Sequence, residues 1–196
     1  MIYGDRIRLR PVERDDLPEF VKWLNDPEVR DGLAAVFPLG LAEEEQWFEK
    51  NLEKEPALRA WAIDALPGPE DLAAWPGSWT HIGGAGFHQI DWRNHSGEIG
   101  IVIGSKENWN QGYGTETVKT LVRWGFYELN LNRIFMRVYE DNGRAIRCYE
   151  KVGFKPEGRL RQDRFHNGRY YDTLIMGLLR SEFAARHGSS TAAKGA

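Results

Sequence analysis

Two glycines stand where a predicted strand meets the longest predicted helix of the chain. The strand, Glu98–Ile103, leads through Gly112 and Gly114 into a helix that begins near Thr115. Glycines in such a turn let backbone N–H groups converge on an anion at the N-terminus of a helix. The turn lacks the third glycine of a dinucleotide-binding loop and the Lys-Ser/Thr pair of a nucleoside-triphosphate loop. It therefore predicts either a phosphate-binding turn of another kind or a tight strand-to-helix connection.

A second segment, Asn142–Phe154, predicts a short helix with chemistry on its inner face. Asn142 is suited to cap the start of this helix, and Gly153 is suited to end it. The apolar spacing places Tyr149 on the inner face, where the ring packs in the core and the hydroxyl reaches the rim. Cys148 lies beside it, and because a buried cysteine more often fills space than attacks a substrate, we expect no covalent intermediate there.

The two motifs, in this order and separated by one helix and one strand, resemble those of the GNAT superfamily of N-acetyltransferases. The resemblance implies that the glycine-rich turn binds the pyrophosphate of acetyl-CoA and that the second helix faces the thioester. It gives Tyr149 a catalytic role, in which the hydroxyl protonates or hydrogen-bonds the departing CoA thiolate. Asn142 would contact the pantetheine arm as well as cap its helix.

The start of the chain carries the resemblance further, to the RimJ/RimL-type branch, which includes N-terminal acetyltransferases of ribosomal proteins. The segments concerned are Ile7–Pro11 and Trp23–Val29, and Glu98–Gly100 and Gly112–Glu116 are also typical of that branch. The similarity extends from Ile7 to about Leu179.

By this resemblance, acetyl-CoA is the expected co-substrate, and no metal is expected. The residues expected to bind it are Ile101, Val102, Ile103, Trp109, Asn110, Gln111, Gly112, Tyr113, Gly114, Thr115 and Asn142. Trp109 stands where the superfamily prefers Arg or Gln, which leaves the phosphates to backbone amides, with Gln111 as a helper. Ala145 stands where many relatives have Ser, which removes one candidate acid.

The pKa of the acceptor amine decides how strongly the reaction depends on a catalytic base. An amine attacks a thioester only when neutral, which at pH 7 costs about 1 kcal/mol for an α-amine but about 4.6 kcal/mol for a lysine-like amine. Glu98, at the start of the strand that leads into the turn, is the leading base, acting directly or through water. His88 and His95 are rival bases because imidazole titrates near neutral pH, and water alone is a further alternative.

Composition excludes several classes of protein. The 196 residues include 26 Lys and Arg against 29 Asp and Glu, a net charge of −3. This balance lacks the basic excess that phosphate-backbone binding requires, so nucleic acid is not an expected partner. No apolar run reaches the ~20 residues of a membrane span. The single Cys permits no internal disulfide, which favours a reducing, cytoplasmic location.

The element pattern predicts an α+β (mixed α/β) fold, with one domain over residues 1–186 and a flexible tail over residues 187–196. Asp16 and Glu19 predict a capping box at the first helix. The resemblance implies a mixed, mostly antiparallel twisted sheet, splayed between the fourth and fifth strands, with helices on both faces. The loop Leu66–Thr80, with Trp75 and Trp79, is interpreted as part of the acceptor wall. Arg159, Arg161, Arg164 and Arg169 are interpreted as a solvated edge near the last hairpin.

The resemblance implies an N-acetyltransferase that moves an acetyl group from acetyl-CoA to a primary amine by direct attack. The expected acceptor is the α-amine of a protein or peptide. Two alternatives stay open: a small-molecule amine such as a polyamine, amino sugar or antibiotic, and an acyl-CoA-binding module without turnover. A homodimer is also left open.

Overall fold

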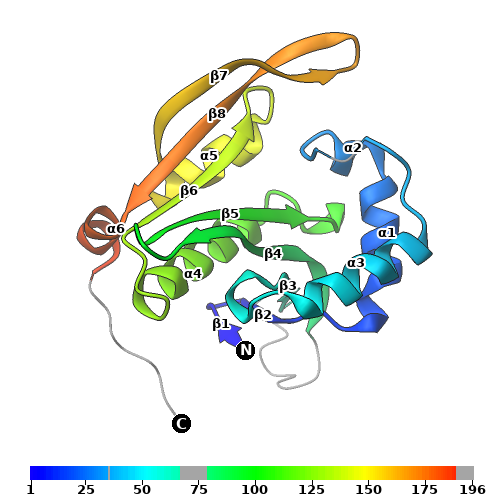
Figure 1. The fold of residues 1–196 in the computed structure, drawn as a ribbon, viewed down its shortest axis with the longest axis horizontal. Helices are drawn as coiled ribbons and strands as arrows, with labels where there is room; N and C mark the ends of the chain where they lie inside the picture. Colours follow the sequence, from blue (N-terminus) through cyan, green and yellow to red (C-terminus); the bar gives the residue numbers. More distant parts are fainter. Residues whose placement is uncertain (35, 67–78, 189–196) are drawn as a thin grey trace.

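An eight-stranded sheet with the order β1-β2-β3-β4-β5-β6-β8-β7 runs through the computed structural model (Figure 1), which describes residues 1–34, 36–66 and 79–188. The strands are β1 (Ile2–Tyr3), β2 (Ile7–Pro11), β3 (Trp61–Ala65), β4 (Thr80–Asp91), β5 (Ser96–Ile103), β6 (Arg133–Tyr139), β7 (Lys155–His166) and β8 (Arg169–Leu179). The helices are α1 (Leu17–Asn25), α2 (Pro27–Arg30), α3 (Leu41–Glu53), α4 (Tyr113–Tyr127), α5 (Gly143–Val152) and α6 (Arg180–His187). The predicted α+β fold is confirmed.

Helices cover both faces of the sheet, and on each face an apolar cluster joins the helices to the sheet. Residues of α4, α5 and α6 pack into the larger cluster, whereas residues of α1, α2 and α3 pack into the smaller one. Strand β5 shows the alternation, because Ile101 and Ile103 contact the α4 cluster while Val102 contacts the α1 cluster. Side chains of a strand point alternately to opposite faces, so the α1 face and the α4 face of β5 are distinct surfaces.

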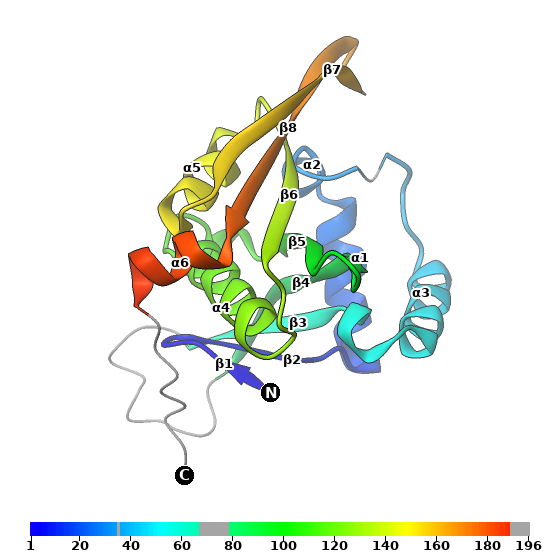
Figure 2. The ribbon, with the colours of Figure 1, turned by 60° about the vertical axis from the view of Figure 1, so that its left-hand side comes forward.

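The sheet opens between β5 and β6. These parallel strands pair over only three positions, Ser96 with Arg133, Gly97 with Ile134 and Glu98 with Phe135, and beyond them the two strands diverge (Figures 1 and 2). All other neighbouring strands are antiparallel. The predicted splay is therefore confirmed. The splay was expected between the fourth and fifth strands. These two strands are β5 and β6 in the structure, because the two-residue strand β1 precedes the first strand expected from the sequence.

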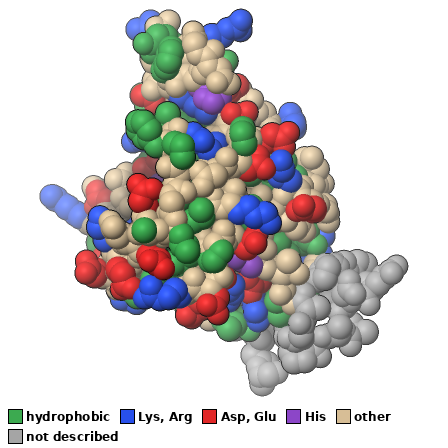
Figure 3. Space-filling model, turned by 90° about the vertical axis from the view of Figure 1, so that its right-hand side faces the viewer, with side chains coloured by type: hydrophobic (Ala, Val, Ile, Leu, Met, Phe, Trp, Pro, Cys, Tyr) green, Lys and Arg blue, Asp and Glu red, His purple; other side chains and the backbone are tan. Residues whose placement is uncertain are grey.

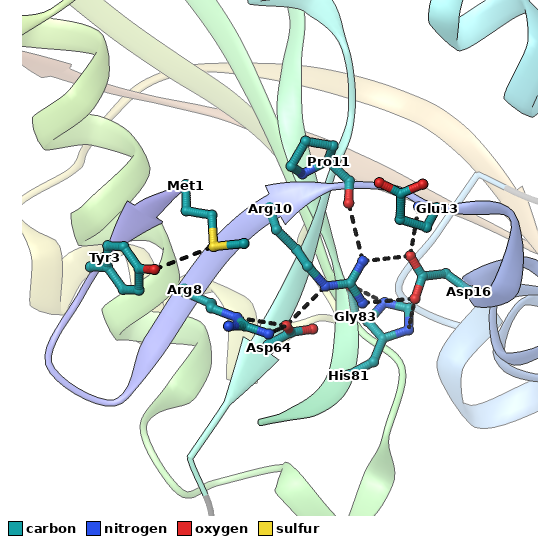
Figure 4. A network of polar contacts seen from close by, with 10 residues as sticks. All are labelled: Met1, Tyr3, Arg8, Arg10, Pro11, Glu13, Asp16, Asp64, His81 and Gly83. Carbon is teal, nitrogen blue, oxygen red and sulfur yellow. Dashed lines mark hydrogen bonds and ion pairs between the residues drawn. The ribbon is translucent and has the colours of Figure 1, made fainter. Parts of the chain in front are cut away.

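A buried ionic network anchors α1 to the sheet (Figure 4). The Arg10 guanidinium donates to both carboxylate oxygens of Asp16 at 2.7 Å and to Asp64 at 2.9 Å. Asp16 occupies the N-cap position of α1 but makes no side-chain capping bond to that helix. The predicted capping box with Glu19 is thus wrong, because Asp16 is bound by Arg10 and by the Glu13 backbone N–H.

The long β7–β8 hairpin projects from the body of the molecule (Figures 1 and 2). Arg164, expected to be solvated, is buried: it donates to the Asp31 carbonyl at 2.7 Å and stacks on Tyr139 at 4.0 Å. That part of the expected basic edge is wrong, because Arg164 connects the hairpin to the segment after α2. Basic and acidic side chains alternate over the face that Figure 3 shows.

Two predictions concern residues outside the described part of the chain. The acceptor loop Leu66–Thr80 falls there over residues 67–78, and the expected tail falls there over residues 189–196. Within the described residues, α6 continues through His187. No helix among them is long and apolar enough to cross a membrane.

Candidate active site

A hollow of about 1250 Å³ occupies the splay of the sheet. Its floor is formed by β4 and β5, one wall by β6 and α5, and another by α1 and α3. Glu98, Tyr149 and Asn142 all line this cavity, although they are far apart in the sequence. The fold therefore brings the predicted catalytic pair and the helix cap into one site.

The glycine-rich turn forms the N-terminus of α4 at one end of the cavity. Gly112 is the N-cap with φ 91°, a left-handed conformation that favours glycine. The first helical hydrogen bond runs from Glu116 N to the Gly112 carbonyl. Among the described residues, the N–H groups of Tyr113, Gly114 and Thr115 therefore have no backbone acceptor. This arrangement fits the phosphates of CoA.

Most of the residues predicted to bind acetyl-CoA line the cavity. They are Ile101, Val102, Ile103, Trp109, Asn110, Gly112, Gly114, Thr115 and Asn142. The side chains of Gln111 and Tyr113 have other partners: Gln111 donates to the Glu107 carbonyl, and buried Tyr113 donates to the Leu66 carbonyl at 2.8 Å. The Gln111 side-chain amide and the Tyr113 hydroxyl are thus each engaged by a backbone carbonyl of the protein.

One cation beside the turn was not predicted from the sequence. Arg6 Nη2 donates to the Gln111 carbonyl at 3.1 Å, and the guanidinium lies 4.8 Å from the centre of the Tyr113 ring. Arg6 also forms an ion pair with Glu116 at 3.3 Å. A separation of 105 residues from Gln111 leaves no local pattern by which a sequence could indicate this contact.

Trp109 and Arg144 both line the cavity and contact each other. The Trp109 indole N–H donates to the Ile103 carbonyl at 2.7 Å, which fixes the ring at the end of β5. The Arg144 guanidinium lies 3.5 Å from the ring centre, a cation–π contact. Asn142 caps α5 as predicted, since its Oδ1 accepts from Ala145 N at 3.1 Å.

Beyond Glu98, the edge of β5 that faces β6 has no partner strand among the described residues. Ile101 and Ile103 lie on this stretch. Every second residue of an antiparallel strand directs its N–H and C=O away from that partner, here β4. The free edge can therefore pair with an extended amide-containing chain, which is the chemical nature of pantetheine.

A β-bulge concentrates polar groups around Glu98. Phe87 pairs with Ile99 and Gln89 pairs with Glu98, which leaves His88 as the extra residue. Gln89 Nε2 donates to Glu98 Oε2 at 3.1 Å, and Arg137 Nε lies 3.4 Å from Glu98 Oε1. His88 lies over Gly100, where a Cβ would come within 2.1 Å of its Nε2. His88 and Glu98 are thus neighbours on the α1 face, whereas the other rival base, His95, belongs to the β4–β5 turn and does not line the cavity.

Tyr149 is 7% exposed and packs in the larger cluster, with Phe154 at 6.2 Å between ring centres. Burial raises the pKa of its phenol above the ordinary range. The hydroxyl therefore stays protonated throughout the neutral range and is available as a proton donor. Cys148 accepts a hydrogen bond from Thr115 Oγ1 at 3.5 Å, and burial raises the pKa of its thiol, which disfavours the nucleophilic thiolate.

Comparisons with known proteins agree with this geometry. A family model described as acetyltransferase (GNAT) domain matches residues 6–155. The N-acetyltransferase p20 of Bacillus licheniformis is 29% identical over 185 residues, which cover 93% of this chain and 98% of that protein. The putative ribosomal N-acetyltransferase YdaF of Bacillus subtilis is 32% identical over 97 residues, 50% of this chain and 52% of that protein. The solved structure of spermidine N-acetyltransferase from Vibrio cholerae in complex with CoA and spermine superposes with a TM-score of 0.78 at 25% identity, over 92% of this chain and 99% of that one.

A splayed sheet with a glycine-rich helix N-terminus beside the opening defines an acyl-CoA-dependent transferase fold. The chain belongs to the GNAT acetyltransferase family, and it is an acetyl-CoA-dependent N-acetyltransferase. The superfamily, the enzyme class and the co-substrate predicted from the sequence are confirmed. The RimJ/RimL-type branch stays a prediction. No group of three or more His, Cys, Asp or Glu side chains suited to a metal occurs in the described ranges.

Proposed function

We propose that this enzyme acetylates the primary amine of a small, positively charged acceptor that enters over the α1 face of β4 and β5. The observation that carries the proposal is the cluster of Glu98, Gln89 and His88 on that face, next to the free edge of β5. The structural similarity to a spermidine N-acetyltransferase supports a small amine.

Glu98 is proposed to remove the proton of the acceptor ammonium, directly or through one water. The neutral nitrogen then attacks the thioester carbonyl carbon, so that a C–N bond forms and the C–S bond breaks. Tyr149 is proposed to give its phenolic proton to the sulfur as it leaves, and the second proton that the nitrogen loses when the amide forms returns to the Tyr149 oxygen through water. Gln89 and Arg137 hold the Glu98 carboxylate in place, and His88 is the next candidate for the base.

The α-amine of a protein or peptide stays a second candidate acceptor. The similarity of half of the chain to a putative ribosomal N-acetyltransferase favours it. An α-amine loses its proton near neutral pH and depends little on a base, whereas an alkyl amine depends strongly on one. The two acceptors therefore predict different consequences of removing Glu98.

A cytoplasmic location also stays a prediction.

The direct test measures free thiol released from acetyl-CoA against a panel of spermidine, other small amines and N-terminal peptides, with mass spectrometry of the products. We expect acetylated small amine and no turnover above hydrolysis with the peptides. Acetylated peptides with unreacted small amines would replace the first acceptor by the second. Thiol release with no acetylated product would contradict amine transfer altogether.

A further inference from the structure

The glycine-rich turn offers backbone donors to the phosphates of CoA but no positively charged side chain. Residues 109–116, which form the turn and the start of α4, include no Lys or Arg. Neutral N–H groups donate hydrogen bonds to phosphate oxygens, whereas a guanidinium also compensates their charge and can bind two oxygens at once. A cation from another part of the chain is therefore expected beside the turn.

Two cations near the turn already have carboxylate partners. Arg6 forms an ion pair with Glu116 at 3.3 Å. Lys106, which precedes the turn, forms ion pairs with Asp26 at 2.7 Å and with Glu28 at 2.8 Å. Neither Arg6 nor Lys106 lines the cavity. The charges of these two side chains are thus compensated within the protein.

Arg144, the second residue of α5, differs from both. Its guanidinium lies 3.5 Å from the centre of the Trp109 ring, at the start of the turn. The side chain is exposed, lines the cavity, and forms no hydrogen bond or ion pair with any residue that the structure describes. The titratable groups close enough to act on its charge are Cys148 and Tyr149. Burial raises the pKa of both, so both are neutral at neutral pH and the charge of Arg144 is uncompensated.

Trp109 fixes the position of this charge. The indole N–H donates to the Ile103 carbonyl at 2.7 Å, and the ring packs against the smaller apolar cluster. A guanidinium stacks on an aromatic ring with its flat face, which leaves the N–H groups at its edge free to donate. Arg144 therefore keeps its donors available while the ring holds it at the turn.

We propose that Arg144 binds the pyrophosphate of CoA at the glycine-rich turn and that Trp109 is the residue that positions it. The N–H groups at the start of α4 and the guanidinium on α5 then bind the phosphates from two different helices. The inference concerns the co-substrate alone, and it holds whichever amine accepts the acetyl group.

Arg144→Gln tests the proposal because it removes the charge and keeps a polar side chain. Calorimetry without any acceptor gives the Kd of CoA and the Kd of dephospho-CoA, which lacks the 3′-phosphate but retains the pyrophosphate. We expect both Kd values to rise at least tenfold, equivalent to about 1.4 kcal/mol. The Kd of wild type should also increase more steeply with salt concentration than the Kd of the variant, because the variant has one fewer charge pair to be screened.

Two further variants serve as controls for the charge. Arg144→Lys should recover part of the affinity, because the positive charge returns without the planar fork of the guanidinium. Lys119→Gln removes an exposed cation of α4 that does not line the cavity, and it should change neither Kd.

Trp109→Leu tests the positioning role. Loss of the cation–π contact should raise both Kd values about two- to fivefold. Combined with Arg144→Gln, it should cause no further loss, because the charge that the ring positions is then absent. Losses that add in the double variant would contradict the positioning role and show that Trp109 acts on CoA by itself.

Two results would overturn the binding role of Arg144. One is wild-type affinity for CoA in Arg144→Gln. The other is a loss of affinity for CoA with dephospho-CoA unaffected, which would assign the guanidinium to the 3′-phosphate instead. Because Arg144 is exposed, its replacement should leave the fold intact, and urea unfolding of each variant checks this.

Discussion

Replacing Gly114 with alanine should raise the stability of the enzyme and weaken its hold on CoA. Gly114 is the second residue of α4, and its φ is not positive. A Cβ there would lie 3.8 Å from both Cys148 Sγ and Ile103 Cγ1, an ordinary contact distance. Alanine is favoured over glycine within a helix by roughly 0.5–1 kcal/mol. The free energy of unfolding should therefore increase by up to about 1 kcal/mol.

The same methyl group should interfere with CoA binding at the glycine-rich turn. Gly114 and both neighbours of the added carbon, Cys148 and Ile103, line the cavity, so the methyl group takes up cavity space beside the N-terminus of α4. A phosphate held away from the N–H donors of the turn loses short, charge-assisted hydrogen bonds. We expect the Kd for CoA to rise at least tenfold, about 1.4 kcal/mol. Gly112 is a less informative position for this substitution, because any side chain there would strain the backbone at φ 91°.

Urea unfolding and calorimetry with CoA give the two quantities independently. Gly158→Ala on β7 is the control, since a Cβ there meets Ile175 at 3.7 Å and lies outside the cavity lining. It should leave CoA affinity unchanged. Wild-type affinity in a folded Gly114→Ala variant would refute the placement of the phosphates, and a large loss of stability would refute the packing argument.

Two further predictions follow from buried titratable groups. Tyr149→Phe should lower kcat by a factor on the order of ten to a thousand, without rescue at high pH and with little change in CoA affinity, because the ring still packs; wild-type kcat in stopped-flow thiol release would exclude the proton donor. Burial lowers the pKa of His81, and the charge of Asp16 partly opposes this effect. The unfolded chain therefore binds more protons than the folded chain, and the free energy of unfolding falls as pH drops through about 6.5. One such group changes it by at most about 1.4 kcal/mol per pH unit. His81→Gln should flatten that part of the urea-unfolding profile between about pH 7.5 and pH 5.5, and an unchanged difference from wild type would show that His81 is not responsible.

Local rules were sufficient where a motif and its partner are close in sequence. The cap at Asn142 and the left-handed Gly153 that ends α5 were predicted, because a side-chain oxygen three residues from an N–H and a glycine at a helix end act within one turn. The strand expected over Glu98–Ile103 was likewise predicted and lies within β5. The splay between β5 and β6 came from resemblance rather than from periodicity, since two strands carry no local signal of where their pairing stops.

Long-range partners explain what the sequence missed. Asp16 looked like a cap but is bound by Arg10, and Arg164 looked solvated but is buried against Tyr139. The bulge that directs His88 onto the face of Glu98 has no sequence pattern by which it could be predicted.

The central claim is that Glu98 deprotonates an alkyl ammonium on the α1 face of the sheet. The pH dependence of kcat/KM in wild type and in Glu98→Gln tests this claim most directly. With spermidine as acceptor, the variant should be strongly impaired near pH 7 and partly recover by about pH 9, because the free-amine fraction rises about a hundredfold over that interval. Glu98→Asp should retain part of the rate. A Glu98→Gln profile that coincides with wild type across the range would contradict the assignment and transfer the test to His88.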